Sequence, residues 1–330
     1  MRLVFSPLLA TVLSAGAVAA EPGLIIDLGG KFDASFNESA FTGAQRWVEE
    51  TDGDYTETEL SSEAQREQTM RRMADRGANP VVTLGFANAS TLEQVAPDYP
   101  ETTFVIIDAV VEEPNVQSIV FAEAEGSYLV GMMAAMASET DTVSFVGGMD
   151  VPLIRKFACG YAQGAQAVDE NIEVISNMTG TTPAAWNDPV RGGELVRAQI
   201  GQGSGVVFAA AGGTGVGVLQ AAADEGIYAI GVDSNQNHLH PGTMLTSMVK
   251  RVDNAVYDAF EASDGGSLET GVQVQDLESQ GVAYAMDQHN ADLVTDEMIE
   301  AVETARDQIV SGELEVHDYT SDDSCPALTF

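Results

Sequence analysis

Residues 24–41 read LIIDLGGKFDASFNESAF and join a short apolar run to the approach of a helix. The run Leu24–Ile26 has the length and the β-branching of a buried strand. Gly29 and Gly30 follow it, and glycine accepts the backbone conformations that close a tight turn. A helical pattern, FTGAQRWVEE, then occupies residues 41–50. A strand, a glycine turn and a helix in this order predict one unit of an open α/β sheet.

The same alternation of strands and helices continues in two successive series. The predicted strands are Leu24–Asp27, Pro80–Leu84, Thr103–Ile107 and Ser118–Phe121 in the first series, and Thr142–Val146, Glu173–Met178, Gly205–Ala210 and Ile227–Val232 in the second. The predicted helices are Glu63–Arg76, a small-residue segment YLVGMMAAMA after Gly126, Pro152–Val168, Gly192–Ile200 and Gly215–Asp224. Such alternation predicts parallel, doubly wound sheets, and two series predict two lobes.

The first twenty residues have the pattern of a secretory signal peptide. A short basic start at Met1–Leu3 precedes a largely apolar stretch to Val18, and small residues before Ala20 fit a cleavage site. No later stretch reaches about 20 uninterrupted apolar residues, and no cysteine lies near the cleavage site. We therefore expect residues 1–20 to be removed and the mature protein to be periplasmic, freely diffusing and not a lipoprotein.

The charge of the chain limits its partners. It carries 51 acidic and 14 basic side chains, which give a formal net charge of −37 at pH 7. This charge repels nucleic acid and anionic membrane surfaces, so no nucleic-acid partner is expected. We interpret the acidity as a property of habitat rather than of ligand, because salt screens exposed charges beyond roughly 8–10 Å.

Cysteine and histidine residues do not predict a metal centre. Cys159 and Cys325 either form a disulfide that ties the C-terminal tail to the body or remain two separate structural thiols. The tail around residues 320–325 is polar and is expected to form an extended strap. The four histidines do not have the spacing of a transition-metal site. We expect neither a metal nor a cofactor.

Polar and aromatic residues follow the predicted strands again and again. Parallel sheets bind ligands beyond the carboxyl ends of their strands. Each cluster also has a plain structural explanation as a helix cap, a packing residue or a turn. Six clusters drawn from two lobes nevertheless predict a shared cleft. They are Asp27 with Phe36 and Asn37, residues 85–88, Asp108, residues 186–188, residues 209–215 and residues 233–236.

The glycine-rich segment GGTGVGV, residues 212–218, does not predict a nucleotide site. It lacks the GK[ST] ending of a phosphate-binding loop, and Val218 stands where a third glycine of the GxGxxG pattern would fall. Backbone N–H groups around Gly212 and Gly213 can still donate hydrogen bonds to a neutral oxygen. With several aspartates in the same cleft, we expect an uncharged ligand that carries hydroxyl groups.

Six segments, taken together, resemble the BMP family, the "basic membrane protein" or purine-nucleoside-receptor-like substrate-binding proteins of ABC transporters. The resemblance runs over residues 23–257 and more weakly to 310. The segments are LGGKFDASFNESAF, VGGMDVPLIRKFACGYAQGA, AAWNDPVRGGELVRAQI, VVFAAAGGTGVGVLQAA, IGVDSNQ and LTSMVKRVDNAVY. The chain differs from lipoprotein members in lacking a lipobox cysteine.

The resemblance implies a type I periplasmic binding fold, in which three crossings join two lobes. It places residues 21–122 and 244–276 in lobe 1, and residues 123–243 and 277–330 in lobe 2. The crossings are expected near Phe121–Gly126, His240–Thr246 and Gln273–Gly281.

The resemblance also implies roles for individual residues. Phe36 resembles the ring that stacks on the base, and Asn37 lies next to it. Asp27 and Asp108 resemble groups at the edge of the base. Asp233 resembles the carboxylate that accepts the ribose hydroxyls.

Further binding residues follow from the same resemblance. Lys250 resembles a lysine that reaches the sugar, and Gly212 and Gly213 belong to the binding loop. Trp186 is the expected second stacking ring, because Phe208 lies inside an apolar strand and is expected in the core.

The function implied is the capture of a purine nucleoside such as inosine, guanosine or adenosine. A monomeric protein would deliver it to the permease subunits of an ABC importer in the inner membrane, without catalytic residues. The alternatives are the same transport role with a sugar, a flavin or a free base, a nucleoside-processing enzyme, and a sensor input lobe. The enzyme is disfavoured because the sequence contains no convincing nucleophile–base pair.

Overall fold

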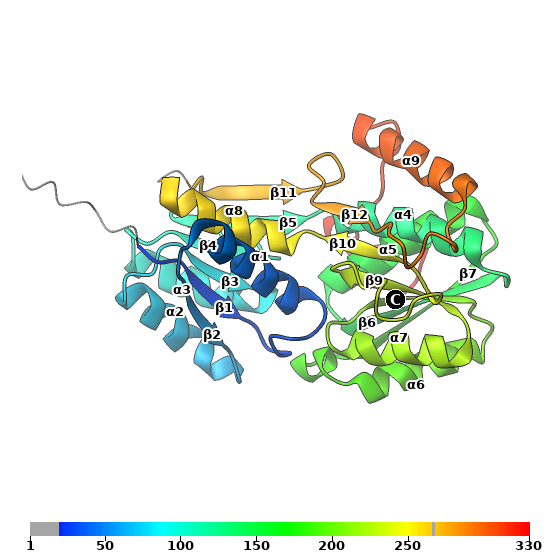
Figure 1. The fold of residues 1–330 in the computed structure, drawn as a ribbon, viewed down its shortest axis with the longest axis horizontal. Helices are drawn as coiled ribbons and strands as arrows, with labels where there is room; N and C mark the ends of the chain where they lie inside the picture. The colour runs from blue at the N-terminus through cyan, green and yellow to red at the C-terminus, as the bar shows by residue number, and fades with distance from the viewer. Residues whose placement is uncertain (1–19, 266–267) are drawn as a thin grey trace, which may run out of the picture.

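A computed structural model of the chain describes residues 20–265 and 268–330. The predicted signal peptide, apart from Ala20, lies outside these residues. Within them, two six-stranded sheets form two adjacent α/β lobes (Figure 1). The two lobes predicted from the strand–helix alternation are confirmed. No helix in the described part of the chain is both long and apolar enough to cross a membrane.

Lobe 1 is built on a parallel sheet with strand order β11-β5-β4-β3-β1-β2. Its strands are β1 (Gly23–Ile26), β2 (Thr56–Glu59), β3 (Val81–Leu84), β4 (Phe104–Ile107), β5 (Val116–Phe121) and β11 (Gly271–Gln275). Its helices are α1 (Phe36–Thr51), α2 (Arg66–Asp75), α3 (Ala89–Val95) and α8 (Val252–Gly265), with 3₁₀ turns at Glu63–Gln65, Phe86–Asn88 and Ala96–Asp98. Strands β1, β3 and β4 are buried along their whole length, as expected for a sheet covered on both faces.

Lobe 2 is built on a sheet with strand order β12-β10-β9-β8-β6-β7, in which β12 alone runs antiparallel to its neighbour. Its strands are β6 (Thr142–Met149), β7 (Glu173–Gly180), β8 (Val206–Ala210), β9 (Tyr228–Asp233), β10 (Met244–Lys250) and β12 (Val282–Tyr284). Its helices are α4 (Glu123–Ala137), α5 (Pro152–Val168), α6 (Pro189–Ile200), α7 (Thr214–Glu225) and α9 (Asp296–Ser311), with 3₁₀ turns at Pro183–Trp186 and Tyr319–Ser321.

Within residues 20–265 and 268–330, three connections pass between the two sheets. The chain crosses between β5 and α4, between β10 and α8, and between β11 and β12. The crossing predicted near His240–Thr246 is wrong. Pro241 and Gly242 form a turn within lobe 2, and the chain returns from it as β10, which pairs in parallel with β9. Residues 244–250 therefore belong to lobe 2, and lobe 1 resumes only at α8.

Helix α1 begins five residues before its expected start. Its first turn is capped by the buried carboxylate of Asp33, which accepts hydrogen bonds from the N–H groups of Ser35, Asn37 and Glu38 at 2.8–3.1 Å. This cap satisfies backbone donors that a helix start would otherwise leave unpaired. Because of it, Phe36 and Asn37 lie on the first turn of the helix rather than in the preceding loop.

Helices α4 and α5 pack with their backbones in direct contact. A Cβ atom built on Gly164 would lie 1.9 Å from the carbonyl oxygen of Tyr128. The same construction places a Cβ on Gly131 at 2.1 Å from the oxygen of Tyr161. Real Cβ atoms do not approach backbone oxygens so closely, so only glycine permits this spacing. Gly131 of the small-residue segment YLVGMMAAMA and Gly164 of α5 therefore allow the two helices to pack this closely.

The C-terminal strap, defined here as residues 314–330, lies along α5. Cys159 of α5 and Cys325 of the strap form a disulfide, which decides between the two alternatives left open by the sequence. The side-chain amide of Gln163 donates to the backbone oxygen of His317 at 2.9 Å and accepts from its N–H at 2.9 Å. The strap thus has both a covalent and a hydrogen-bonded attachment to lobe 2.

Gly164→Ala is expected to destabilise the protein by about 1–3 kcal/mol, because the new methyl group must push α4 and α5 apart. Gly180→Ala is the matched control. A Cβ at Gly180 would lie at an ordinary 3.5 Å from Ala185, so this change should alter the free energy of unfolding by less than about 0.5 kcal/mol. Urea denaturation of both variants measures the difference, and equal stabilities would refute the close-packing argument.

Candidate functional site

A cavity of about 80 Å³ lies between the lobes, where the carboxyl ends of strands from both sheets meet. A cavity needs at least about 10–15 Å³ to hold one water molecule, so this one has room for a few waters at most. Its lining comes from both lobes. The residues are Asp27, Leu28, Asp33, Phe36, Asn37, Gly85, Phe86, Asp108, Leu153, Ile154, Phe157, Trp186, Ala210, Ala211, Gly212, Val232, Asp233 and Lys250.

Aromatic rings form part of the cavity wall. Phe36 comes from the first turn of α1, Phe157 from α5 and Trp186 from the turn after β7. The indole of Trp186 lies against Gly148 and Gly212, where a Cβ would be 2.2 and 3.6 Å from ring atoms. The absence of a side chain at Gly148 therefore gives the indole its place in the cleft, whereas a Cβ at Gly212 would make only an ordinary contact with the ring. Phe208, by contrast, is wholly buried.

The core around Phe208 explains why it does not reach the cleft. Its ring centroid lies 5.4 Å from that of Phe145 and 5.5 Å from that of Tyr161. The structure thus places Trp186, and not Phe208, in the cavity lining, as the sequence analysis expected.

Lys250 is the charged centre of the site. It ends β10 and is only 1% exposed. Its Nζ lies 2.7 Å from Oδ2 of Asp108, and it also lies 5.3 Å from the ring centroid of Phe36. Lys250 therefore joins a carboxylate of lobe 1 to the sheet of lobe 2 beside an aromatic ring.

Burial dominates the protonation of the two aspartates near Lys250. Loss of solvent raises the pKa of Asp108 to about 6, although the ammonium of Lys250 opposes the shift. Loss of solvent likewise raises the pKa of Asp233 to about 6. Burial alone would lower the pKa of Lys250, but Asp108, Glu123 and Asp233 together raise it. Lys250 is therefore charged at neutral pH, and the aspartates ionise only above about pH 6.

Both of these aspartates have a left-handed backbone conformation. Asp108, which follows β4, has a φ of 72°, and Asp233, which ends β9, has a φ of 63°. Residues other than glycine adopt such angles rarely, and a conformation of this kind is typical of functional sites. Asp108 and Asp233 thus turn the chain sharply at the ends of β4 and β9, and both line the same cavity.

Asp27 occupies the lobe-1 end of the cavity. Its Oδ1 lies 2.6 Å from an Nη atom of Arg66, a buried residue of α2. Burial raises the pKa of Asp27 despite this ion pair. A Cβ on Gly85 would lie 2.8 Å from the carboxylate of Asp27, so glycine is needed after β3. Asn37 donates its amide to backbone oxygens of Asp27 and Gly30, at 3.3 and 3.1 Å, and braces this loop.

Direct contacts between the lobes close the cleft. The hydroxyl of Ser35 donates to Asp233, and the side-chain amide of Gln236 donates to the backbone oxygen of Ala34 at 2.6 Å. With the ion pair of Lys250 and Asp108, these contacts hold the cavity at its small volume. A ligand larger than a few waters requires the lobes to separate and must replace some of these bonds.

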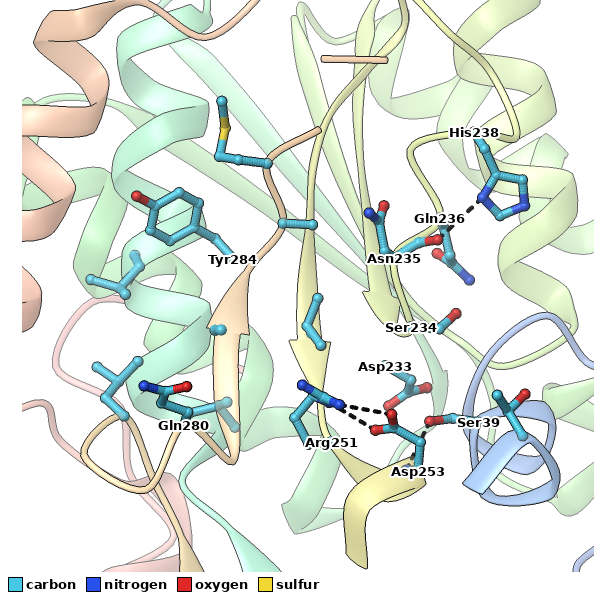
Figure 2. A pocket seen from close by; sticks show the side chains of 18 of the residues that line it. Ser39, Asp233, Ser234, Asn235, Gln236, His238, Arg251, Asp253, Gln280 and Tyr284 are labelled. Carbon is cyan, nitrogen blue, oxygen red and sulfur yellow. Dashed lines mark hydrogen bonds and ion pairs between the residues drawn. The ribbon is translucent and has the colours of Figure 1, made fainter. Parts of the chain in front are cut away.

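Asp233 also borders a larger groove of about 850 Å³ outside the cavity. Figure 2 shows its lining, in which Arg251 pairs with Asp253 and His238 contacts Asn235. We take the smaller cavity as the candidate site, since it collects the strand ends, the aromatic rings and the aspartates with a raised pKa. Charged residues of the groove pair with one another, Arg251 with Asp253 and Arg306 with Glu303.

The structure brings eight of the nine predicted binding residues to the cavity lining. The exception is Gly213, which follows Gly212 but does not line the cavity. A Cβ atom built on Gly213 would lie 3.8 Å from the Cβ of Asp33 across the cleft. Phe86 lines the cavity and belongs to the cluster of residues 85–88 that the sequence analysis placed in the cleft. Residues that it did not name as binding residues include the lining residues Asp33 and Phe157, and two buried partners, Arg66 and Glu123.

The sequence contained a signal for some of these residues. Glu123 follows strand β5, so the same strand-end argument that selected Asp108 would have selected it. Phe157 shares a helical face with Leu153 and Ile154. That spacing predicts a common face, but the side of the helix that meets the cleft depends on the packing of the lobes.

Comparison with known proteins places the chain in a family. Residues 23–320 match the family model described as "ABC transporter substrate-binding protein PnrA-like", named Bmp. The chain belongs to the Bmp family. The resemblance drawn from the six sequence segments is therefore confirmed, and the protein is a substrate-binding protein of the ABC-transporter type.

Relatives and solved structures agree with this family. A Lactococcus lactis protein named "ABC transporter nucleoside-binding protein BmpA" is 31% identical over an alignment of length 317 that covers 89% of this chain and 88% of that protein. A solute-binding protein of an ABC transporter system from Aeropyrum pernix K1 superposes with a TM-score of 0.84 at 27% identity, over 92% of this chain and 95% of the other. A Conexibacter woesei solute-binding protein, at 22% identity and a TM-score of 0.73 over 91% and 99% of the two chains, supports the fold alone.

The expected localisation needs correction. A Pyrococcus furiosus relative, 32% identical over 79% of this chain and 69% of its own length, is named an uncharacterized lipoprotein. A Borreliella burgdorferi relative, 34% identical over 61% of this chain and 58% of its own length, is named basic membrane protein D. These names contradict the expectation of a freely diffusing periplasmic protein that is not a lipoprotein.

Asp233→Asn is expected to stabilise the unliganded protein at pH 7.5 by about 1–3 kcal/mol, since one pKa unit corresponds to about 1.4 kcal/mol. The folded carboxyl has a pKa of about 6, against 3.8 without burial, so the folded state holds the proton more tightly. Its contribution to stability is complete below about pH 3.8 and is lost as the pH rises through 6. Neutral asparagine avoids that loss, so the gain should vanish near pH 4.

Asp150→Asn provides a control of opposite sign. The hydrogen bond from Arg155 holds the pKa of Asp150 below its usual value, so removal of this charge should destabilise the protein at neutral pH. Thermal unfolding of both variants from pH 4 to 8 measures the two trends. A loss of stability in Asp233→Asn that is the same at every pH would contradict the burial argument.

Proposed function

We propose that the cleft captures a purine nucleoside for delivery to the permease subunits of an ABC importer. The observation that carries this proposal is the combination, in one cavity, of aromatic rings with the buried carboxylates of Asp108 and Asp233 around Lys250. The name of the L. lactis relative, a nucleoside-binding protein, supports the same ligand class.

The aromatic lining suits the base. Phe36 and Trp186 are the rings that we expect to stack on it, because both line the cavity and come from different lobes. A stacked aromatic pair contributes roughly 0.5–1.5 kcal/mol beyond the burial of its area. Asp27 and Asn37 lie in the same part of lobe 1, and we propose that they receive the polar edge of the base.

The carboxylates suit the sugar. Vicinal hydroxyl groups are hydrogen-bond donors, and an ionised carboxylate accepts from them in charge-assisted bonds worth roughly 1.5–3 kcal/mol each. Asp233 already accepts from one hydroxyl, that of Ser35, in the closed cleft. We propose that a ribose hydroxyl replaces Ser35 there, while Lys250 donates to a sugar oxygen.

The charge of the cavity opposes phosphorylated ligands. Its charged lining residues are four aspartates and one lysine, and that lysine is paired with Asp108. A phosphate would therefore enter a region of negative potential without a free cation. We propose binding without turnover, because the carboxylates that could act as acid or base are engaged with Lys250, Arg66 and Ser35.

Purine nucleosides should raise the melting temperature, whereas their 5′-monophosphates should raise it little or not at all. At a ligand concentration one hundred times Kd, the expected stabilisation is about 2.7 kcal/mol. Differential scanning fluorimetry with inosine, guanosine and adenosine, each paired with its monophosphate, measures this difference. Free ribose and a flavin are included. A shift with either of them and none with any nucleoside would overturn the proposed ligand.

Asp233→Asn should weaken the binding of inosine by about 1.5–3 kcal/mol, because a charge-assisted acceptor is lost. Binding of the free base hypoxanthine should change far less, since the base contacts Phe36 and Trp186 instead. Calorimetry of wild type and variant with both ligands at pH 7.5 gives the comparison. If both ligands lose affinity equally, or neither does, Asp233 does not bind the sugar.

A further inference from the structure

A buried row of charged side chains continues from Lys250 away from the cavity. Nζ of Lys250 lies 3.0 Å from Oε1 of Glu123, and Oε2 of Glu123 lies 2.9 Å from Nζ of Lys156. Lys156 in turn lies 3.1 Å from Oδ2 of Asp318 in the C-terminal strap. With Asp108, these residues form an unbroken sequence of alternating charges from the cavity to the strap.

The row lies at two of the crossings between the lobes. Glu123 is the first residue of α4, directly after the crossing from β5, and Lys250 is the last residue of β10, directly before the crossing to α8. Lys156 donates to the backbone oxygen of Phe121, the last residue of β5, at 2.8 Å. The same contacts that hold Lys250 therefore hold the chain where it passes from one lobe to the other.

Glu123 is buried as deeply as Lys250 and depends on its partners. Both residues are 1% exposed, and Lys156 is 8% exposed. Burial alone would raise the pKa of Glu123, but the two ammonium groups of Lys250 and Lys156 lower it. An unpaired charge at such a site is strongly unfavourable. Glu123 is therefore ionised and shared between two lysines, only one of which reaches the cavity.

We propose that Glu123 and Lys156 are positioning residues for ligand binding. They fix the ammonium of Lys250 at the cleft and determine how much of its charge is available to Asp108 and Asp233. This inference rests on the proposed function, in which those two aspartates and Lys250 contact the ligand. Neither Glu123 nor Lys156 lines the cavity. Both act on it through Lys250, and the charge of Glu123 also repels the carboxylates of Asp108 and Asp233 directly.

Opposite changes in the row should produce opposite effects at the cavity. Glu123→Gln removes a negative charge that competes for Lys250, so the cavity aspartates should ionise more easily. Lys156→Met leaves Glu123 with Lys250 as its only cation, so the aspartates should ionise less easily. The other charged groups facing them are Asp33 and the pair of Asp27 with Arg66, which both variants leave unchanged. A merely structural role would not give shifts of opposite sign.

The first experiment needs no ligand. NMR of the unliganded protein with ¹³C-labelled aspartate carboxyls follows the titration of Asp108 and Asp233. The midpoint should fall by about one pH unit in Glu123→Gln and rise by about one unit in Lys156→Met. The double variant removes a charge of each sign and should return the midpoint close to that of wild type. It also provides a neutral replacement of the pair if Lys156→Met alone fails to fold.

Arg155→Gln is the matched control. Arg155 is adjacent to Lys156 on α5 and also contacts the strap, through the hydroxyl of Tyr319 at 2.9 Å, but it pairs with Asp150 outside the row. Its loss should lower the melting temperature without moving the titration midpoints. Shifts of the same sign in both single variants, no shift in either, or an equal shift in Arg155→Gln would overturn the proposal.

The second experiment measures inosine binding by calorimetry. With a midpoint moved from about 6 to about 7, Lys156→Met should bind about tenfold more weakly than wild type at pH 5, but less than twofold more weakly at pH 7.5. Glu123→Gln should bind more tightly than wild type at pH 5. Equal losses at both pH values would overturn the positioning role. If wild type binds no nucleoside, the proposed ligand fails, whereas the NMR midpoints still decide whether the row controls the cavity aspartates.

Discussion

The two-lobed structure depends on the ion pairs that the buried ammonium group of Lys250 makes with Asp108 and Glu123. The ammonium group has carboxylate partners on both sides of the cleft, with Asp108 from lobe 1 and Glu123 at the start of lobe 2. A cation buried so deeply is tolerated only where opposite charges surround it. The lobes must therefore meet at this point, and the cavity, the crossings and the strap are all arranged around the same group.

The buried carboxylates of Asp108 and Asp233 favour a ligand that supplies hydrogen-bond donors, because they have little access to water. Asp108 and Asp233 have strained backbone angles and lie away from solvent, which raises their pKa. Such arrangements stabilise the unliganded protein less than an apolar core would, and they are retained where function needs them. Donors supplied by a ligand would offset part of this unfavourable burial.

The sequence predicted those elements whose own residues determine them. The ends of strand β4 and helix α5 were predicted to within one residue. Strand β4 is a continuous apolar run and α5 an amphipathic one, and turn residues bound both. The edge strands β2 and β11 were missed, because TETE and GVQVQ become strands only through pairing with β1 and β5. In the site, the strand-end rule found Asp108 and Asp233. Arg66 and Lys156 could not be found this way, since only tertiary packing brings their helices to the cleft.

The loop of chain that the disulfide between Cys159 and Cys325 closes is not confined to lobe 2. The 166-residue separation between these cysteines includes the second and third crossings, and therefore also α8 and β11 of lobe 1. A single peptide-bond cleavage anywhere between the two cysteines would leave one covalently connected molecule, because the strap still joins its end to α5. Such a closed ring of chain would keep a singly cut molecule in one piece wherever a protease attacks one of its exposed turns in this region.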